Sequence, residues 1–305
     1  MTKDNLARFG LAAYAAHPLF RTVGLDRTFY APMPQHELAD LAAMTPPDFR
    51  FLVKAHQVCT RPATDEHGRT FGATGGMDKP NPEFLEPSYA LARVVGPSVL
   101  GLASRCGPIV FQFPPMDLSP RGQVASVLGL SAKGGLTAAG VVSHLLDRLE
   151  RFLAALPAGP QGPWSITPLY AVEVRNRELL TPRYIEILRS RGIVTALAGH
   201  PSQPPLADQH TILQPAAGSA LVIRWLLHPS EKYESAKSRY EPFDNLVDPD
   251  PPARSAIATL CIEALAKGLP TYVVANNKAE GSAPRSIEKL ARQIAAVLDV
   301  PADQL

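Results

Sequence analysis

The feature that most constrains the fold is a repeated alternation between short apolar runs and longer helical segments. Seven runs rich in Val, Ile, Leu and Phe predict strands at 22–26, 49–55, 108–113, 169–175, 193–198, 220–226 and 271–276. Helical periodicity predicts helices around them, at about 4–16, 35–44, 88–105, 138–156, 182–191, 252–267 and 284–298. Such alternation favours a parallel sheet covered by helices.

Two of these helices carry a clear apolar stripe at helical spacing. In the segment 138–156 the stripe consists of Val141, Leu145, Leu149, Phe152 and Leu156. In the segment 284–298 it consists of Ile287, Leu290, Ile294 and Val297. We expect both stripes to face a core.

Loop lengths help to choose between an open doubly wound sheet and a closed barrel. Connections that lead into strands are short, such as RSRG before 193 and AKGLP before 271. Connections that leave strands are long and rich in Gly and Pro, at about 56–87, 114–137 and 227–251. A barrel places its working loops on that one face, whereas no GxGxxG follows a strand to support a dinucleotide fold.

The number of strands is one short of a complete barrel. Seven strands are predicted, and a helix precedes the first of them. The sequence therefore predicts an α/β fold of the TIM-type (β/α)8 barrel class that lacks or displaces its first strand. Residues 1–305 are expected to form a single barrel-like domain.

Composition narrows the classes of partner. The net charge of +2 is too small to argue for nucleic acid by itself. No apolar run approaches the ~18 residues of a membrane helix, and MTKDNLARFG lacks a signal-peptide pattern. The three cysteines Cys59, Cys106 and Cys261 are far apart and odd in number, so we interpret them as reduced thiols of a cytoplasmic protein with no membrane partner.

Polar residues gather where the predicted strands end. They are Asp26, Lys54, Gln112, Glu173, Arg175, Arg224, Asn276 and Asn277. In a barrel these ends converge on one mouth. In LYAVEVRN, Glu173 and Arg175 stand two residues apart, on one face of a strand. A buried charge without a partner costs several kcal/mol, so we expect these groups to pair with one another or to face a ligand.

Each of these residues also has a purely structural interpretation. Glu173 could be the buried counter-ion of Arg175, Lys54 or Arg224. The functional alternative is that three cations around one or two carboxylates hold an anionic ligand, such as a phosphate, a carboxylate or a nucleotide. Gln112 and Asn276 could either orient the edge of a sugar or base or tie loops to the backbone.

Other candidate groups carry weaker signals. Three histidines follow strand ends, namely His56, His200 and His228. Because none shows HExxH or HxH spacing, we expect no metal and no other cofactor. Cys59 is interpreted as a buried bystander rather than a nucleophile. Tyr233 and Tyr240, in KYESAKSRY, could stack on a base or sugar, or could belong to a solvated helical turn.

Several stretches resemble a known family in the order in which they occur. They are FRTVGLDRTFYAPMP, FRFLVKAHQVCTR, IVFQFPP, AVEVRN and VVANNKAEGSAPRSIEKL, between about residues 18 and 298. Together they resemble the domain-of-unknown-function 72 family, also called YecE-like. The resemblance implies a TIM-type barrel and brings Tyr30, from the TFY triplet, into the predicted substrate site. Residues that match the family position by position are Lys54, Gln112, Glu173, Arg175, Asn276 and Asn277.

The sequence also departs from the family pattern. A Gly-rich SGW-like motif of the usual first strand does not precede Leu6, and Gly24, Asp26 and Arg27 stand where the family commonly has Glu followed by Asn or Ser. Arg224 matches a family arginine, but its strand continues as WLLH without the usual Gly. These departures leave both an active enzyme and a divergent, inactive member open.

The leading hypothesis is an enzyme, a hydrolase or isomerase of sugar- or phosphate-type substrates, that binds a small anionic ligand at the barrel mouth. Glu173 and Lys54 are the predicted catalytic residues, with Glu173 as general base or acid. The predicted substrate-binding residues are Gln112, Arg175, Arg224, Asn276, Asn277, Asp26 and Tyr30. Two alternatives remain: a non-catalytic nucleic-acid-binding module, and a degenerate scaffold that oligomerises to complete the barrel.

Overall fold

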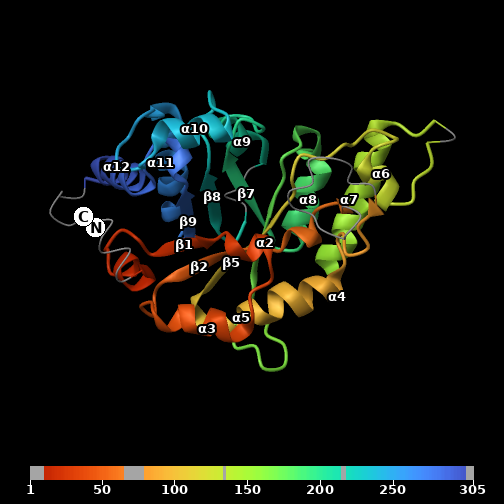
Figure 1. Cartoon of the computed structure of the whole chain (residues 1–305), viewed down its shortest axis with the longest axis horizontal. Coiled ribbons are helices and arrows are strands. Elements are labelled where there is room, and N and C mark those ends of the chain that lie inside the picture. Colours follow the sequence, from red (N-terminus) through yellow and green to blue (C-terminus); the bar gives the residue numbers. More distant parts are fainter. Residues whose placement is uncertain (1–9, 65–78, 133–134, 214–217, 300–305) are drawn as a thin grey trace. The chain divides into compact units, whose positions relative to one another are not determined.

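The computed structural model describes residues 10–64, 79–132, 135–213 and 218–299. The chain divides into two compact units. The central unit comprises Gly24–Arg191, and the terminal unit comprises Met1–Val23 together with Gly192–Leu305. Figure 1 labels the elements of both units. The expectation of one domain over residues 1–305 stays a prediction.

Three adjacent parallel strands form the centre of the central unit. They are β2 (Arg50–Lys54), β5 (Cys106–Gln112) and β6 (Leu169–Glu173). Val53 lies opposite Ile109, and Ile109 lies opposite Tyr170. The middles of these strands are buried and rich in Val, Ile and Phe, as is typical of parallel strands that are covered on both faces. Each of the three strands was predicted within three residues at either end.

Three further strands lie between residues 22 and 80, and the first of them spans the boundary between the two units. The predicted strand β1 (Thr22–Leu25) comes first. A short antiparallel pair, β3 (Ala63–Thr64) and β4 (Lys79–Pro80), was not predicted. Strands of two residues are too short to show an alternation of apolar and polar positions, so no pattern predicted them.

Helices surround the strands of the central unit. They are α2 (Arg27–Tyr30), α3 (Gln35–Ala43), α4 (Pro87–Ala90), α5 (Gly96–Leu102), α6 (Gln123–Val127), α7 (Ala138–Ala155) and α8 (Pro182–Ser190). The predicted stripe of α7 is confirmed, since all five of its residues are buried. The short helices α2 and α6 were not predicted, because about one turn of helix carries no periodicity.

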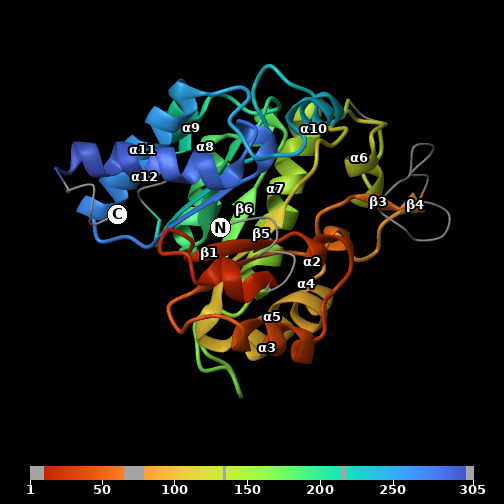
Figure 2. The ribbon, with the colours of Figure 1, turned by 60° about the vertical axis from the view of Figure 1, so that its left-hand side comes forward.

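The predicted helix 88–105 is interrupted. The segment consists of α4, a π-helical turn at Leu91–Val95, α5 and a 3-10 turn at Ala103–Arg105. Pro97, in the first turn of α5, lacks the N–H that a continuous helix needs there. In α5, a Cβ atom at Gly101 would lie 2.5 Å from the backbone oxygen of Gln35. The absence of a side chain thus lets α3 and α5 pack closely, side by side (Figure 2).

The terminal unit repeats the same architecture. Its parallel strands are β7 (Val194–Gly199), β8 (Leu221–Trp225) and β9 (Thr271–Ala275), all predicted. Its helices are α9 (Leu206–Leu213), α10 (Tyr233–Tyr240), α11 (Pro251–Ala266) and α12 (Ala283–Val297). Helix α9 was not predicted, and a solvated helical turn at α10 was one of the two interpretations left open. Residues 10–15 are helical, and the rest of the predicted helix 4–16 before them lies outside the described residues.

The prediction of which face of the last helix is buried is partly wrong. Helix α12 buries Leu290 as predicted and packs beside α11 (Figure 2). Val297, however, is 64% exposed. Ser286 and Ala295 are buried instead, because small side chains let the helix approach its neighbours closely and periodicity counts only large apolar residues.

The fold class predicted from the sequence is confirmed. Strands follow in chain order within each unit, β2-β5-β6 and β7-β8-β9, with helices between them. With β1, the series found among the described residues has seven strands, one fewer than the eight of a TIM-type barrel. Within the described ranges, no helix is long and apolar enough to cross a membrane.

Candidate functional site at the strand ends

The ends of β2, β5 and β6 bring predicted site residues together in the central unit. Gln112 and Glu173 are the last residues of their strands and lie opposite each other in the parallel register. Lys54 ends β2 and lies opposite Val110, two residues before Gln112. The backbone ladder continues past these ends, since Phe113 N donates to Glu173 O at 2.8 Å. Three polar side chains therefore originate from one edge of the sheet, the edge where ligands bind in parallel α/β folds.

Glu173 and Arg175 form a buried ion pair. Arg175 Nη2 lies 2.5 Å from Glu173 Oε1, and both side chains are less than 10% exposed. Strand β6 ends at Glu173, two residues earlier than the predicted strand 169–175, so Arg175 lies just past the strand and its side chain returns to the carboxylate at the strand end. The expectation that the two groups pair is confirmed. A buried ion pair is weak evidence for stability, so its position at a strand end leaves a functional role open.

Lys54 is held by the TFY triplet. Its Nζ lies 3.6 Å from the centroid of the Phe29 ring, the geometry of a cation–π contact. The neighbouring Thr28 Oγ1 lies 2.6 Å from both Leu25 O and Lys54 O. Helix α2 is thereby fixed to the ends of β1 and β2. The motif fixes the lysine at the strand end, with Phe29 beneath its ammonium group and Thr28 bound to its backbone.

Tyr30 and Asp26 lie at the two ends of α2 and are both exposed. The backbone of Tyr30 forms a hydrogen bond with His56, whose Nδ1 lies 2.7 Å from Tyr89 Oη. Burial lowers the pKa of His56, Arg93 lowers it further, and the bond to Tyr30 partly opposes both. His56 is thus a neutral imidazole near pH 7 that links α2 to α4.

Gln112 and Asn176 organise the loops that leave β5 and β6. Thr60 Oγ1 donates to Gln112 O at 2.7 Å, which ties the loop after β2 to the end of β5. Asn176 Oδ1 accepts from Met116 N at 2.8 Å, and its Nδ2 donates to Met116 O at 3.0 Å. Asn176 was not singled out from the sequence, although it follows a strand end in the motif AVEVRN. These two hydrogen bonds to the backbone of Met116 give Asn176 a structural role.

The remaining predicted site residues belong to the terminal unit. Arg224 is buried in β8, opposite Val274 of β9. Asn276 Oδ1 accepts from Lys278 N at 3.0 Å, and Asn277 Oδ1 accepts from Ala283 N at 2.8 Å, at the start of α12. The carbonyl oxygens of both amides therefore hold the turn between β9 and α12.

A second buried ion pair was missed by sequence reasoning. Glu280 Oε1 pairs with Arg254 Nη2 and accepts from Asp250 N at 2.7 Å, and the Glu280 side chain is fully buried. The backbone oxygen of Glu280 accepts from Val247 N at 2.8 Å. The motif NNKAEGSAP contains Glu280, but its partner lies in α11, far away in sequence. No spacing rule could have paired them.

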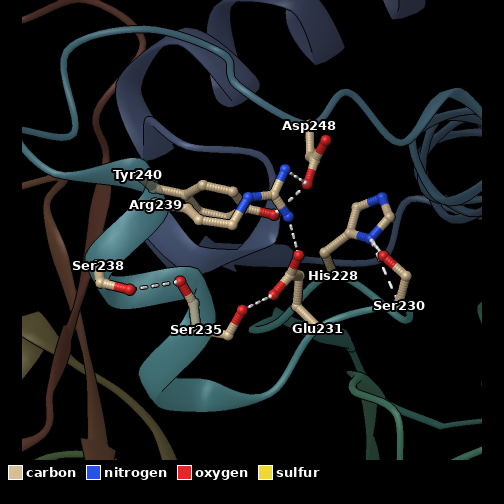
Figure 3. A network of polar contacts seen from close by, with 8 residues as sticks. All are labelled: His228, Ser230, Glu231, Ser235, Ser238, Arg239, Tyr240 and Asp248. Atoms are coloured by element: carbon tan, nitrogen blue, oxygen red, sulfur yellow. Dashed lines mark hydrogen bonds and ion pairs between the residues drawn. The ribbon is translucent and has the colours of Figure 1, made fainter.

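A polar network surrounds α10 (Figure 3). Glu231 pairs with Arg239 and accepts from Ser235 Oγ at 2.6 Å. Asp248 Oδ2 lies 3.0 Å from Arg239 Nη2 and accepts from Tyr240 Oη at 2.9 Å. Tyr240 is buried, so the idea that it stacks on a ligand is wrong. Arg239 thus binds both carboxylates and links the segment before α10 to the segment after it.

Histidines and cysteines show no metal or nucleophile site in the described ranges. No group of three or more His, Cys, Asp or Glu residues could hold a metal ion there. His200 and His228 instead place Nδ1 near the hydroxyl groups of Ser202 and Ser230. Burial raises the pKa of Cys59 to about 12, so that thiol stays protonated, as expected of a buried bystander.

Comparison with known proteins identifies the family. The family model described as "Protein of unknown function DUF72" matches residues 2–304. Among solved structures, a DUF72 family protein (EF0366) from Enterococcus faecalis V583 is 16% identical, with a TM-score of 0.52 over 97% of this chain and 95% of that chain. A DUF72 family protein (TM1631) from Thermotoga maritima MSB8 is 19% identical, with a TM-score of 0.53 over 96% of this chain and 90% of that chain.

At these identities the structural likeness shows the fold alone. A search among curated proteins found no match to the chain. The family match covers nearly all 305 residues. The chain therefore belongs to the DUF72 family, also called YecE-like.

Proposed function

We propose that the ends of β2, β5 and β6 bind an anionic sugar- or nucleotide-like ligand and that the protein is an enzyme that acts on it. The observation that carries the proposal is the placement of Lys54, Glu173 and Arg175. All three are buried ionisable side chains at the carboxyl ends of adjacent strands. Clusters of this kind at strand ends are candidates for function, because burial and neighbouring charges tune their protonation.

The proposed roles follow from the contacts. Arg175 orients the Glu173 carboxylate, so Glu173 serves as the general base or acid of a hydrolase or isomerase. Lys54, supported by the Phe29 ring, supplies positive charge to the ligand. Gln112, opposite Glu173 in the register, contributes a neutral hydrogen-bonding side chain at the same edge.

A thermal-shift screen tests the proposal. Sugar phosphates, nucleotides and short oligonucleotides are each added to the wild type, Lys54→Met and Glu173→Gln. A ligand at about 100 times its dissociation constant should add about 2.7 kcal/mol of apparent stability. We expect one class of small anions to stabilise the wild type. Lys54→Met should lose most of this response, because the methionine keeps the apolar stem and removes the charge.

Asp147→Asn is the matched control. Asp147 pairs with Arg183 in an ion pair whose side chains are about 40% exposed, on α7 and α8. This variant alters a carboxylate in the same unit without touching the strand ends, so its ligand response should equal that of the wild type. The proposal fails if no small anion stabilises the wild type, or if all four proteins respond alike. A response to oligonucleotides alone would favour the nucleic-acid-binding alternative.

A further inference from the structure

The side chain of a buried lysine in the terminal unit takes no part in the ion pairs and turns described above. Lys278 follows β9 in the 3-10 turn Asn277–Ala279 and is only 9% exposed. Its ammonium group lies 4.3 Å from the ring centroid of Tyr233 and 5.7 Å from that of Phe243. In the part of the chain that the structure describes, no carboxylate pairs with this ammonium group.

Three carboxylates in the segments around Lys278 are engaged by arginines. Glu231 and Asp248 both pair with Arg239 (Figure 3). Glu280, two residues after Lys278, pairs with Arg254. A buried cation without an anionic partner is unfavourable, and two aromatic faces compensate for it only in part. An anion supplied by a ligand would complete the arrangement.

The aromatic side chains differ in their surroundings. Phe243 packs against the buried cluster of Leu227, Ala236 and Tyr240. Tyr233, in contrast, is 58% exposed although its ring lies beside the lysine. A large aromatic ring that is fixed at one side and open to solvent can stack on a planar ring of a ligand.

The backbone holds this group firmly at the strand end. Lys278 N donates to Asn276 Oδ1 at 3.0 Å, and Lys278 O accepts from His228 N at 3.0 Å. The lysine is therefore fixed between the turn after β9 and the loop after β8. Those loops follow the carboxyl ends of neighbouring parallel strands, the usual position of ligand sites in such sheets.

We propose that Lys278 and Tyr233 form a binding site for a nucleotide-like ligand, in which Lys278 contacts the phosphate and Tyr233 stacks on the base. Phe243, the second aromatic ring near the ammonium group, supports the lysine. The inference is independent of the proposed site in the central unit, because it involves only side chains of the terminal unit. It also assigns a role to Lys278, which the sequence did not single out.

Calorimetric titration with AMP tests the proposal on the full-length protein. Lys278→Met should weaken AMP binding at least tenfold, because the phosphate loses its charged partner. Tyr233→Leu should weaken AMP binding but leave the weaker binding of ribose 5-phosphate unchanged, whereas Tyr233→Phe should bind AMP like the wild type. Lys237→Met, on the exposed side of the same helix, is the matched charge control and should bind normally.

Stability measurements separate a ligand site from a structural contact. If Lys278 serves a ligand, Lys278→Met should fold with an unchanged or higher melting temperature, because it removes an uncompensated buried charge. The proposal is overturned if AMP does not bind the wild type, or if Lys278→Met binds AMP normally. It is equally overturned if Lys278→Met lowers the melting temperature, because the lysine would then be a structural contact.

Discussion

Replacing Glu173 with Gln should destabilise the central unit strongly. The carboxylate is fully buried and lies 2.5 Å from Arg175, which is itself buried. Two unit charges about 4 Å apart attract by about 4 kcal/mol at an effective dielectric constant of about 20. Removing one partner of such a pair typically costs about 3–5 kcal/mol, because the other charge remains buried. For a unit of this size we expect the melting temperature to fall by about 6–20 °C.

Scanning calorimetry of matched variants checks this expectation. Asp147→Asn disrupts an exposed ion pair in the same unit and should cost about 0–1 kcal/mol. The double variant Glu173→Leu with Arg175→Met removes both charges, so it should recover part of the loss. A melting temperature for Glu173→Gln within about 2 °C of that for Asp147→Asn would refute the reasoning. Such a result would mean that the ion pair of Glu173 contributes little to the stability of the folded protein.

Two further predictions concern the turn after β9 and the cysteines. Gly281→Ala should destabilise the protein by about 1–3 kcal/mol in urea unfolding, because φ is 117° and the new Cβ would lie 2.5 Å from Asn245 O. Gly129→Ala, with φ of 66° and open space around it, should lose less, and equal losses would contradict the steric argument. Burial raises the pKa of Cys59, Cys106 and Cys261 to about 12, so iodoacetamide should label them at about pH 8 only after unfolding. The stability that depends on these protonated thiols should be complete below about pH 9 and should fall as pH rises toward about 12; rapid labelling of the native protein would contradict the raised pKa values.

The sequence by itself determined the series of strands and helices. The seven strands and α7 were visible because long buried strands are continuous apolar runs and amphipathic helices repeat every 3.6 residues. The alternation of LYAVEVRN also predicted that Glu173 and Arg175 lie close together, although β6 ends at Glu173 and Arg175 follows it. Polar residues at the ends of apolar strands were a local signal, so Lys54 and Gln112 could also be found from the chain alone.

Only the tertiary structure decided which of these side chains meet and which merely hold loops. The pairing of Glu280 with Arg254 joins residues 26 positions apart, and the position of Lys278 beside Tyr233 joins a turn to a helix 45 residues earlier in the sequence. Asn276 and Asn277, which looked like ligand-binding amides, use their oxygens to fix a turn. Such contacts depend on how separate elements pack in space, and no periodicity along the chain encodes them.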